Sequence, residues 1–298
     1  MSEKSRLIFN TRLQWLMKLF TLFSVLTLFI IFIGLVYKSY PILKTNSIAH
    51  FLFSTEWFPQ KDKFGLFPFI ISTLWVTAIA MVLAVPFCIL AAIYLSEYAD
   101  KKIIGWITPL IDILAGIPSV IFGIWGIIVV VPFVRDYLAP FFGKVSTGYS
   151  LLTGGIVLSV MIVPVMVNIL LEVFGTVSKG LKEASLSLGA TKWQTIKNVL
   201  LRKAAPGIVS AIALSLSRAF GETLAVLMVV GNVTKVPQSM LDPGQPLPAL
   251  IANNYGEMMS IDLYDSALLL ASLVLFAIVL IFNIASRLIL RKMERSLG

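Results

Sequence analysis

The chain has 298 residues, of which 58% are hydrophobic and 13% are charged, and its formal net charge is +9. Soluble domains carry about 25% charged residues, so this composition excludes an ordinary soluble globular protein. The basic residues lie in the polar connections along the chain and do not gather in one segment, which argues against a nucleic acid partner.

Long apolar blocks separated by polar connections predict six transmembrane helices. A helix needs about 20 apolar residues to cross the ~30 Å hydrocarbon layer of a bilayer, and each block reaches about that length. We therefore expect an all-α integral membrane protein in contact with lipid, with a cytoplasmic N-terminal segment (1–18) followed by a single six-helix domain (19–298). The predicted spans are 19–37, 68–95, 104–134, 150–172, 206–231 and 266–290.

The first block resembles a signal peptide because basic residues precede it, but no small-residue cleavage pattern follows, so we interpret it as an uncleaved helix. Cytoplasmic segments of membrane proteins are enriched in Lys and Arg. With the N-terminus inside, 16 of the 24 Lys and Arg residues fall in cytoplasmic segments and seven in external ones. The distribution predicts that both termini are cytoplasmic.

Two predicted external connections, 38–67 and 232–265, are too long to be simple turns. They suit docking of an external partner, and solvated spacers are the alternative. The chain has one cysteine, Cys88, and one histidine, His50, which has no companion at ligand spacing. We therefore expect no intrachain disulfide and no metal site.

The third predicted span contains Gly116-Ile117-Pro118-Ser119. Proline removes a backbone donor and clashes with the preceding turn, so we expect this span to be kinked or broken at Pro118 and Ser119. Such a break lines a transport pathway in one interpretation and is a packing kink in the other.

Residues 175–205 form a cytoplasmic connection that carries its own helical pattern. Leu181, Ala184 and Leu188 recur at helical spacing, and Gly189 then supplies a residue suited to ending a helix. Thr191 and Gln194 fit a capping box that starts a second helix. A helix-Gly-helix hairpin is suited to fit a groove on a soluble partner, and an amphipathic hairpin on the membrane surface is the alternative.

The residues Glu183-Ala184-Ser185, Gly189 and Val199-Leu200-Leu201 resemble the EAA loop of ATP-binding-cassette importer permeases. Ser185 and Arg202 depart from the usual Ala and Pro of that motif. The resemblance implies that the hairpin couples the permease to a separate ATPase, through Glu183, Ala184, Leu188 and Gly189. The chain has no G-x-x-x-x-G-K-[ST] phosphate loop, so ATP and Mg would be bound by that partner and no cofactor by this chain.

Further segments resemble the PstC-type permeases of phosphate importers, which are multi-pass proteins of the prokaryotic inner membrane. The resemblance implies a PstA-like sister permease in a heterodimer, a homodimeric ATP-binding-cassette ATPase and an external phosphate-binding protein as partners, and no catalytic residue in this chain. The segments are Trp57-Phe58-Pro59, Phe64–Phe69, Ala115–Gly123, Arg218–Thr223, Gly231-Asn232 and Ile251–Glu257.

Arg218 lies near the middle of the fifth predicted span, and Glu222 follows four residues later, on the same face of a helix. A charge at the bilayer centre costs about 2.5–3.5 kcal/mol, so Arg218 needs a partner. In one interpretation the two side chains form a structural salt bridge. In the other, Arg218 offers its guanidinium to phosphate in transit and Glu222 orients it. The small residues Ser217, Gly221 and Ala225 predict that another helix approaches closely here. This places the charged pair at the contact with the sister permease.

Three other functions remain open from the sequence. A permease for another oxyanion, such as molybdate or sulfate, would share the hairpin and the topology. A secondary transporter or channel would need no ATPase, and a membrane scaffold would transport nothing. The hairpin argues against a secondary transporter or channel, and the charged pair within a span argues against a scaffold.

Overall fold

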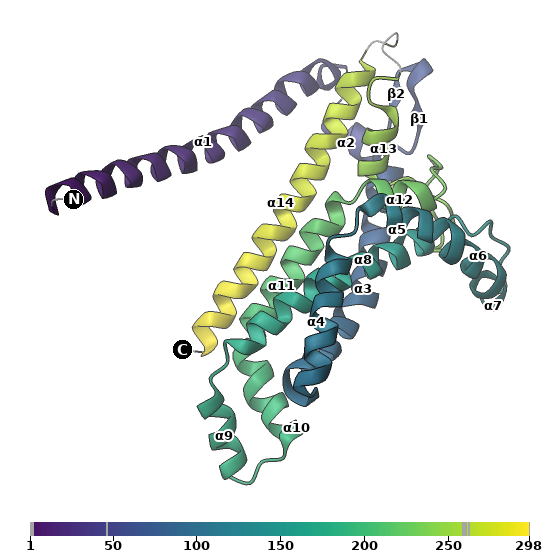
Figure 1. Cartoon of the computed structure of the whole chain (residues 1–298). Coiled ribbons are helices and arrows are strands. Elements are labelled where there is room, and N and C mark those ends of the chain that lie inside the picture. The colour runs from purple at the N-terminus through teal and green to yellow at the C-terminus, as the bar shows by residue number, and fades with distance from the viewer. Residues whose placement is uncertain (1–2, 46, 258–260, 262, 298) are drawn as a thin grey trace.

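The computed structural model describes residues 3–45, 47–257, 261 and 263–297, and its architecture is helical throughout the membrane-spanning part (Figure 1). Among these residues, six helical segments are long and apolar enough to cross a membrane, which confirms the predicted fold class. Which end faces the cytoplasm stays a prediction. The segments are Leu13–Leu43, Phe67–Tyr98, Ser119–Phe141, Leu151–Gly175, Lys192–Gly221 and Tyr264–Met293.

The centre of the bundle is the contact between α3 (Phe67–Ile93) and α8 (Leu151–Gly175), which run side by side. Small residues allow this close approach, because a Cβ atom on Gly155 would lie 2.4 Å from Cγ2 of Ile79. Helix α11 (Leu201–Gly221) packs against this pair, and α14 (Tyr264–Leu297) packs against α11.

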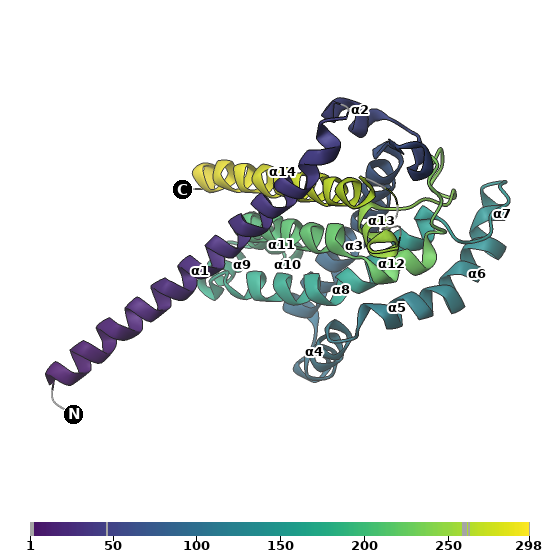
Figure 2. The same cartoon turned by 90° about the horizontal axis from the view of Figure 1, so that it is seen from above.

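Helix α1 (Glu3–Leu43) extends away from the bundle in both views (Figures 1 and 2). It meets α14, where the rings of Phe32 and Phe276 lie 5.6 Å apart, and its most apolar stretch has no buried residues. The predicted span 19–37 lies inside this longer helix. The predicted N-terminal segment 1–18 begins outside the described residues, at 1–2, and is helical from residue 3 onward.

The third span differs from the predicted helix 104–134. Helix α4 (Lys101–Ala115) ends at Gly116, and α5 (Ser119–Trp125) begins after Pro118, whose ψ of 140° is not helical. The expected break is therefore confirmed, and the span runs from Ser119 to Phe141 as an arm that leads away from the bundle (Figure 1). The arm contains η3 (Gly126–Val130), α6 (Val131–Phe133), η4 (Val134–Leu138) and α7 (Ala139–Phe141), of which η3 and η4 are π-helical.

The fifth span also differs from the predicted range 206–231. Helix α11 ends at Gly221, Glu222 is extended with φ −70° and ψ 124°, and a separate helix α12 (Leu224–Val229) follows. At its other end α11 continues from α10 (Lys192–Thr195) through a π-helical turn, η5 (Ile196–Leu200). The continuous helix therefore begins in the connection before the predicted span and ends ten residues before the predicted end.

The opposite end of the bundle from the hairpin carries the folded parts of both long connections. An aromatic cluster of Trp57, Phe64, Phe69 and Tyr264 fixes the first of them against α3 and α14. The second folds inward, where the Gly244 amide donates to the Val230 carbonyl at 3.0 Å. The elements here are α2 (Ile48–Phe53), η1 (Pro59–Lys61), α13 (Leu247–Asn254) and the antiparallel strands β1 (Trp57–Phe58) and β2 (Lys63–Phe64).

Candidate functional site

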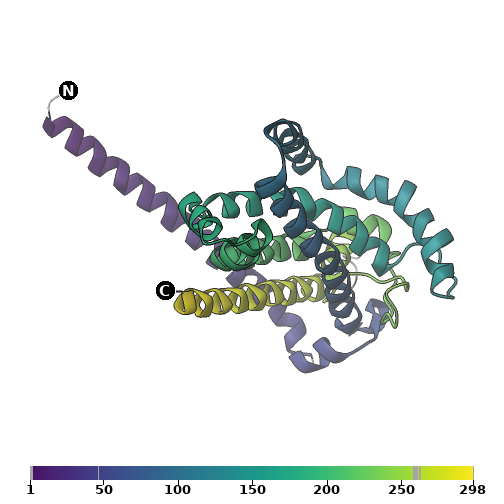
Figure 3. The ribbon, with the colours of Figure 1, turned by 90° about the horizontal axis from the view of Figure 1, so that it is seen from below.

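The connection between α8 and α11 forms a helical hairpin. Helix α9 (Lys179–Ser187) ends before Gly189, whose φ of +85° lies in the left-handed region, and α10 begins three residues later. The Thr191 hydroxyl accepts from the Gln194 amide at 3.3 Å, and the Gln194 side chain accepts from the Thr191 amide at 2.8 Å. The predicted helix-Gly-helix arrangement and its capping box are confirmed. In the view from below, the hairpin in green faces the viewer (Figure 3).

The tip of the hairpin is apolar and exposed. Leu188 is 89% exposed, and Leu181, Leu186 and Trp193 are each about half exposed. Leu188 was expected on the apolar stripe of the first helix, but it follows the last turn of α9 and points to solvent because the chain turns at Gly189. Glu183 and Ala184 are also exposed. All four residues predicted to couple thus lie on the accessible surface.

The hairpin is attached to the bundle through its basic residues. Lys182 on α9 forms an ion pair with Glu97, and the Lys192 Nζ lies 4.4 Å from the ring centre of Tyr98. Both partners belong to η2 (Tyr94–Tyr98), a π-helical turn that continues α3. Sequence reasoning missed these contacts, because Glu97 and Lys182 are 85 residues apart and no local pattern relates them.

The break in the fifth span separates Arg218 from Glu222. Because α11 ends at Gly221, the two residues do not share a helix face, and the expected i, i+4 geometry is absent. Glu222 instead accepts from the Ala225 backbone amide, in the first turn of α12, at 3.3 Å. Arg218 is exposed in the last turn of α11 and has no ion pair within the part of the chain that the structure describes. Each charge lies at the helix end that its sign favours.

Helix α14 holds the last turn of α11 in place. The Asn283 amide donates to the Ser217 hydroxyl at 2.9 Å, and the rings of Phe220 and Phe282 lie 5.0 Å apart. The small-residue stripe that was expected beside Arg218 is not continuous, because Ser217 contacts α14 and Ala225 lies on α12. A Cβ atom on Gly221 would meet nothing within 4 Å.

The two broken spans meet each other. Helix α5, which follows the break at Pro118 and Ser119, packs along α12, which follows the break at Glu222. A Cβ atom on Gly123 would lie 3.2 Å from the Cα atom of Ala225, so the two helices are in close contact. Interrupted helices whose ends meet within a membrane protein are a common way to build a substrate pathway.

A hollow of about 580 Å³ lies at the end of α12. Its wall includes Gly231 and Asn232, and Asn232 is in the left-handed region with φ of 51°. These two residues form one of the segments on which the sequence resemblance rests. The remaining lining residues are Thr147, Tyr149, Met228, Val233 and Pro243.

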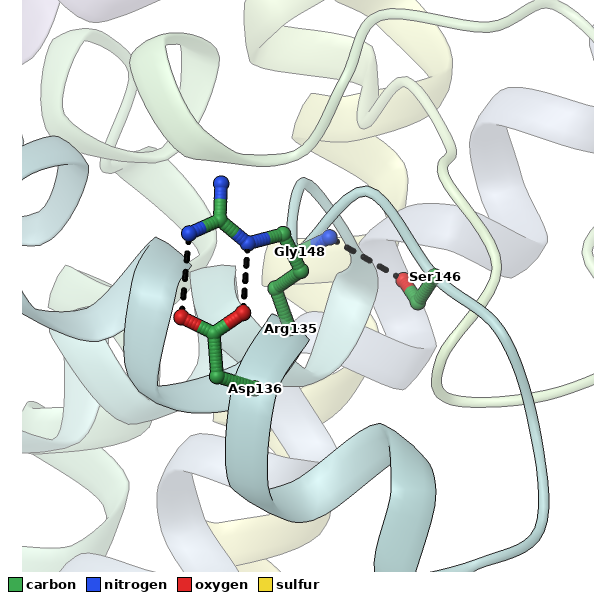
Figure 4. Close-up of polar contacts among 4 residues, drawn as sticks. All are labelled: Arg135, Asp136, Ser146 and Gly148. Carbon is green, nitrogen blue, oxygen red and sulfur yellow. Dashed lines mark hydrogen bonds and ion pairs between the residues drawn. The ribbon is translucent and has the colours of Figure 1, made fainter.

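The arm beyond this hollow carries a second arginine, which is already paired (Figure 4). Asp136 accepts from Arg135 at 2.7 and 2.9 Å, so the guanidinium is occupied by a carboxylate. The adjoining loop returns close to the arm: the Gly148 amide donates to the Ser146 hydroxyl at 3.2 Å, and a Cβ atom at Gly148 would clash with the Val131 carbonyl at 2.2 Å. Arg218 differs from Arg135 in having no ion pair with a carboxylate among the described residues.

Comparison with known proteins matches residues 84–295 to the family described as binding-protein-dependent transport system inner membrane component. The chain is 38% identical over 262 residues to the phosphate transport system permease protein PstC of Xylella fastidiosa, covering 83% of this chain and 80% of that protein. It is 35% identical to the PstC protein of Haemophilus influenzae over the full length of both chains.

Among solved structures, a bacterial ABC transporter involved in the import of the acidic polysaccharide alginate superposes with a TM-score of 0.58. The match covers 96% of this chain and 99% of that chain at 17% identity, so it shows a shared fold.

Proposed function

Because the chain belongs to the family of binding-protein-dependent transport system inner membrane components, we propose that it is a permease subunit of an ATP-driven importer of inorganic phosphate. The observation that carries the proposal is the similarity over most of its length to permeases named for phosphate transport. Membership of this family makes the chain a multi-pass component of membrane transport.

The hairpin is the attachment point for a separate ATPase in this proposal. Its exposed apolar tip around Leu188 suits insertion into a groove, since burial of a leucine side chain contributes about 1.5–3 kcal/mol. ATP and Mg are bound by the partner, which is a homodimeric ATP-binding-cassette protein. The hairpin end of the molecule is cytoplasmic, and so are both termini.

Phosphate crosses between this chain and a PstA-like sister permease, after delivery by an external phosphate-binding protein. Arg218 is exposed on the isolated chain at the break of the fifth span, where a sister subunit can cover it. A guanidinium binds phosphate oxygens through two parallel hydrogen bonds. Glu222, at the start of α12, limits the net positive charge at the break and so helps phosphate to leave.

The test is uptake of radiolabelled phosphate by cells that express this gene together with genes for the sister permease, the ATPase and the binding protein. We expect uptake that depends on metabolic ATP and disappears when this gene alone is omitted. Uptake that continues without this gene, or without the ATPase gene, contradicts the proposal.

A further inference from the structure

The hairpin follows α8 and precedes α11 along the chain, so the backbone joins it directly to these two helices. A three-residue link, 176–178, connects it to α8, and η5 continues it into α11. Helix α3 has no covalent connection to it. The ion pair of Lys182 with Glu97 and the contact of Lys192 with Tyr98 supply the missing attachment.

The hairpin is attached to η2 at two points. Each helix of the hairpin contributes one lysine, Lys182 from α9 and Lys192 from α10. These lysines contact Glu97 and Tyr98, which are adjacent residues of η2. The two helices are also tied to each other, because the Ser185 and Thr195 hydroxyls lie 2.9 Å apart. Two contacts on a braced hairpin resist rotation as well as displacement.

The ion pair is more sheltered than the other ion pairs of the described chain. The side chains of Lys182 and Glu97 are 21% and 14% exposed, whereas those of the Lys63–Glu56 and Arg135–Asp136 pairs are about half exposed. The attraction within a partly buried ion pair is weakened less by salt and by water than that of an exposed pair. The turn that receives it, η2, is π-helical, a geometry that occurs mostly as single turns and often at functional sites.

We propose that Glu97 and Tyr98 are positioning residues that transmit movement of the hairpin to α3. The inference rests on the proposed role of the hairpin in coupling to an ATPase. Because α3 packs closely against α8 through Gly155 and Ile79, a displacement of η2 moves the α3 and α8 pair together. Without these two contacts, movement of the hairpin reaches α3 only through the packing of α3 against α8 and α11.

The experiment measures phosphate transported per ATP hydrolysed by the purified four-component complex in proteoliposomes. Glu97→Gln and Lys182→Gln are each expected to lower this ratio about tenfold, while the ATPase still copurifies. The exchanged pair, Glu97→Lys with Lys182→Glu, is expected to restore the ratio to within about twofold of the parent. Lys102→Gln, which removes an exposed lysine near the same end of the molecule, is the control and leaves the ratio unchanged.

Tyr98 provides an independent variant because the proposed contact needs only its ring. Tyr98→Phe keeps an aromatic face for Lys192 and retains the parental ratio, whereas Tyr98→Leu lowers it. Equal ratios for the two Tyr98 variants contradict a role for the ring.

The outcomes separate this inference from the proposed function. If the parent complex binds the ATPase and transports phosphate while the Glu97 and Lys182 variants keep its ratio, the transmission role is wrong and the proposed function stands. If the single variants lose the ATPase and the exchanged pair does not recover it, the pair is only structural and the inference is overturned. Failure of the parent to bind an ATPase overturns the proposed function itself.

Discussion

Arg218 differs from the other arginine described in detail, because its guanidinium has no carboxylate partner among the described residues while that of Arg135 is held by Asp136. Its place in the last turn of α11 favours a positive charge, since the helix dipole is negative there. The end of α11 therefore stabilises the positive charge of Arg218 without a carboxylate partner, as the proposed binding of phosphate requires.

Arg218→Lys keeps the positive charge and its interaction with the helix end but loses the planar fork that binds two phosphate oxygens. We expect an assembled complex whose phosphate uptake is reduced at least about tenfold. Initial uptake rates and copurification of the partner subunits measure the two effects. Arg287→Lys, an exposed arginine on α14, is the matched control. Near-normal uptake by Arg218→Lys would remove the translocation role.

Gly189 allows the hairpin to turn because its φ is +85°, and a Cβ atom there would meet nothing within 4 Å. Substitution therefore acts through the backbone and not through a clash. A β-branched residue in this conformation costs about 1–2 kcal/mol, whereas asparagine adopts it readily.

Gly189→Val is therefore expected to lower ATPase copurification and phosphate uptake together, while the protein still inserts in the membrane. Gly189→Asn is expected to retain both. Pull-down of the ATPase and uptake assays on the two variants make the comparison. Equal behaviour of the two would show that the left-handed turn is not needed.

At the scale of the elements, the packing of α3 against α8 depends on the absence of a side chain at Gly155, where a Cβ atom would also lie 2.7 Å from Cβ of Ile79. Gly155→Val forces the two helices apart, and overpacking of this kind costs about 1–3 kcal/mol. We expect a lower Tm for the detergent-solubilised complex. Gly34→Val on α1, where nothing lies within 4 Å, is the control and leaves Tm nearly unchanged.

The sequence predicted elements well where one signal dominates. Apolar runs located the spans, and Gly189 with Thr191 and Gln194 located the hairpin, because these are local features of the chain. The prediction from sequence failed where hydropathy does not mark the end of a helix. Residues 206–231 are mainly apolar on both sides of Gly221, so hydropathy did not show the end of α11 there, and Glu222 was placed on a helix that does not continue.

The candidate site could be predicted in part for the same reason. Arg218 and Glu222 stood out as charged residues in a mainly apolar block, and the exposed residues of the hairpin carried a motif. The contacts of Asn283 with Ser217 and of Glu97 with Lys182 join distant segments, so they depend on tertiary packing that no local pattern encodes.

At the scale of the whole molecule, the predicted orientation can be tested with one cysteine at each end. Val145 is fully exposed on the loop after α7, and Leu188 is 89% exposed at the hairpin tip, whereas Gln245 in the second connection is 3% exposed and would react poorly. In a Cys88→Ala background, Val145→Cys is expected to react with a membrane-impermeant maleimide added outside intact cells. Leu188→Cys is expected to react only after the cells are opened, and the reverse pattern would invert the whole topology.

The identity of the transported anion is the central claim for the assembled complex, and the most direct measurement is substrate selectivity in proteoliposomes. Vesicles contain the complex with ATP enclosed on the side of the ATPase, and the binding protein and a labelled anion are added on the other side. We predict ATP-dependent accumulation of phosphate that a hundredfold excess of sulfate or molybdate does not reduce. This result requires binding free energies that differ by more than about 2.7 kcal/mol. Accumulation of sulfate or molybdate with no accumulation of phosphate would contradict the account.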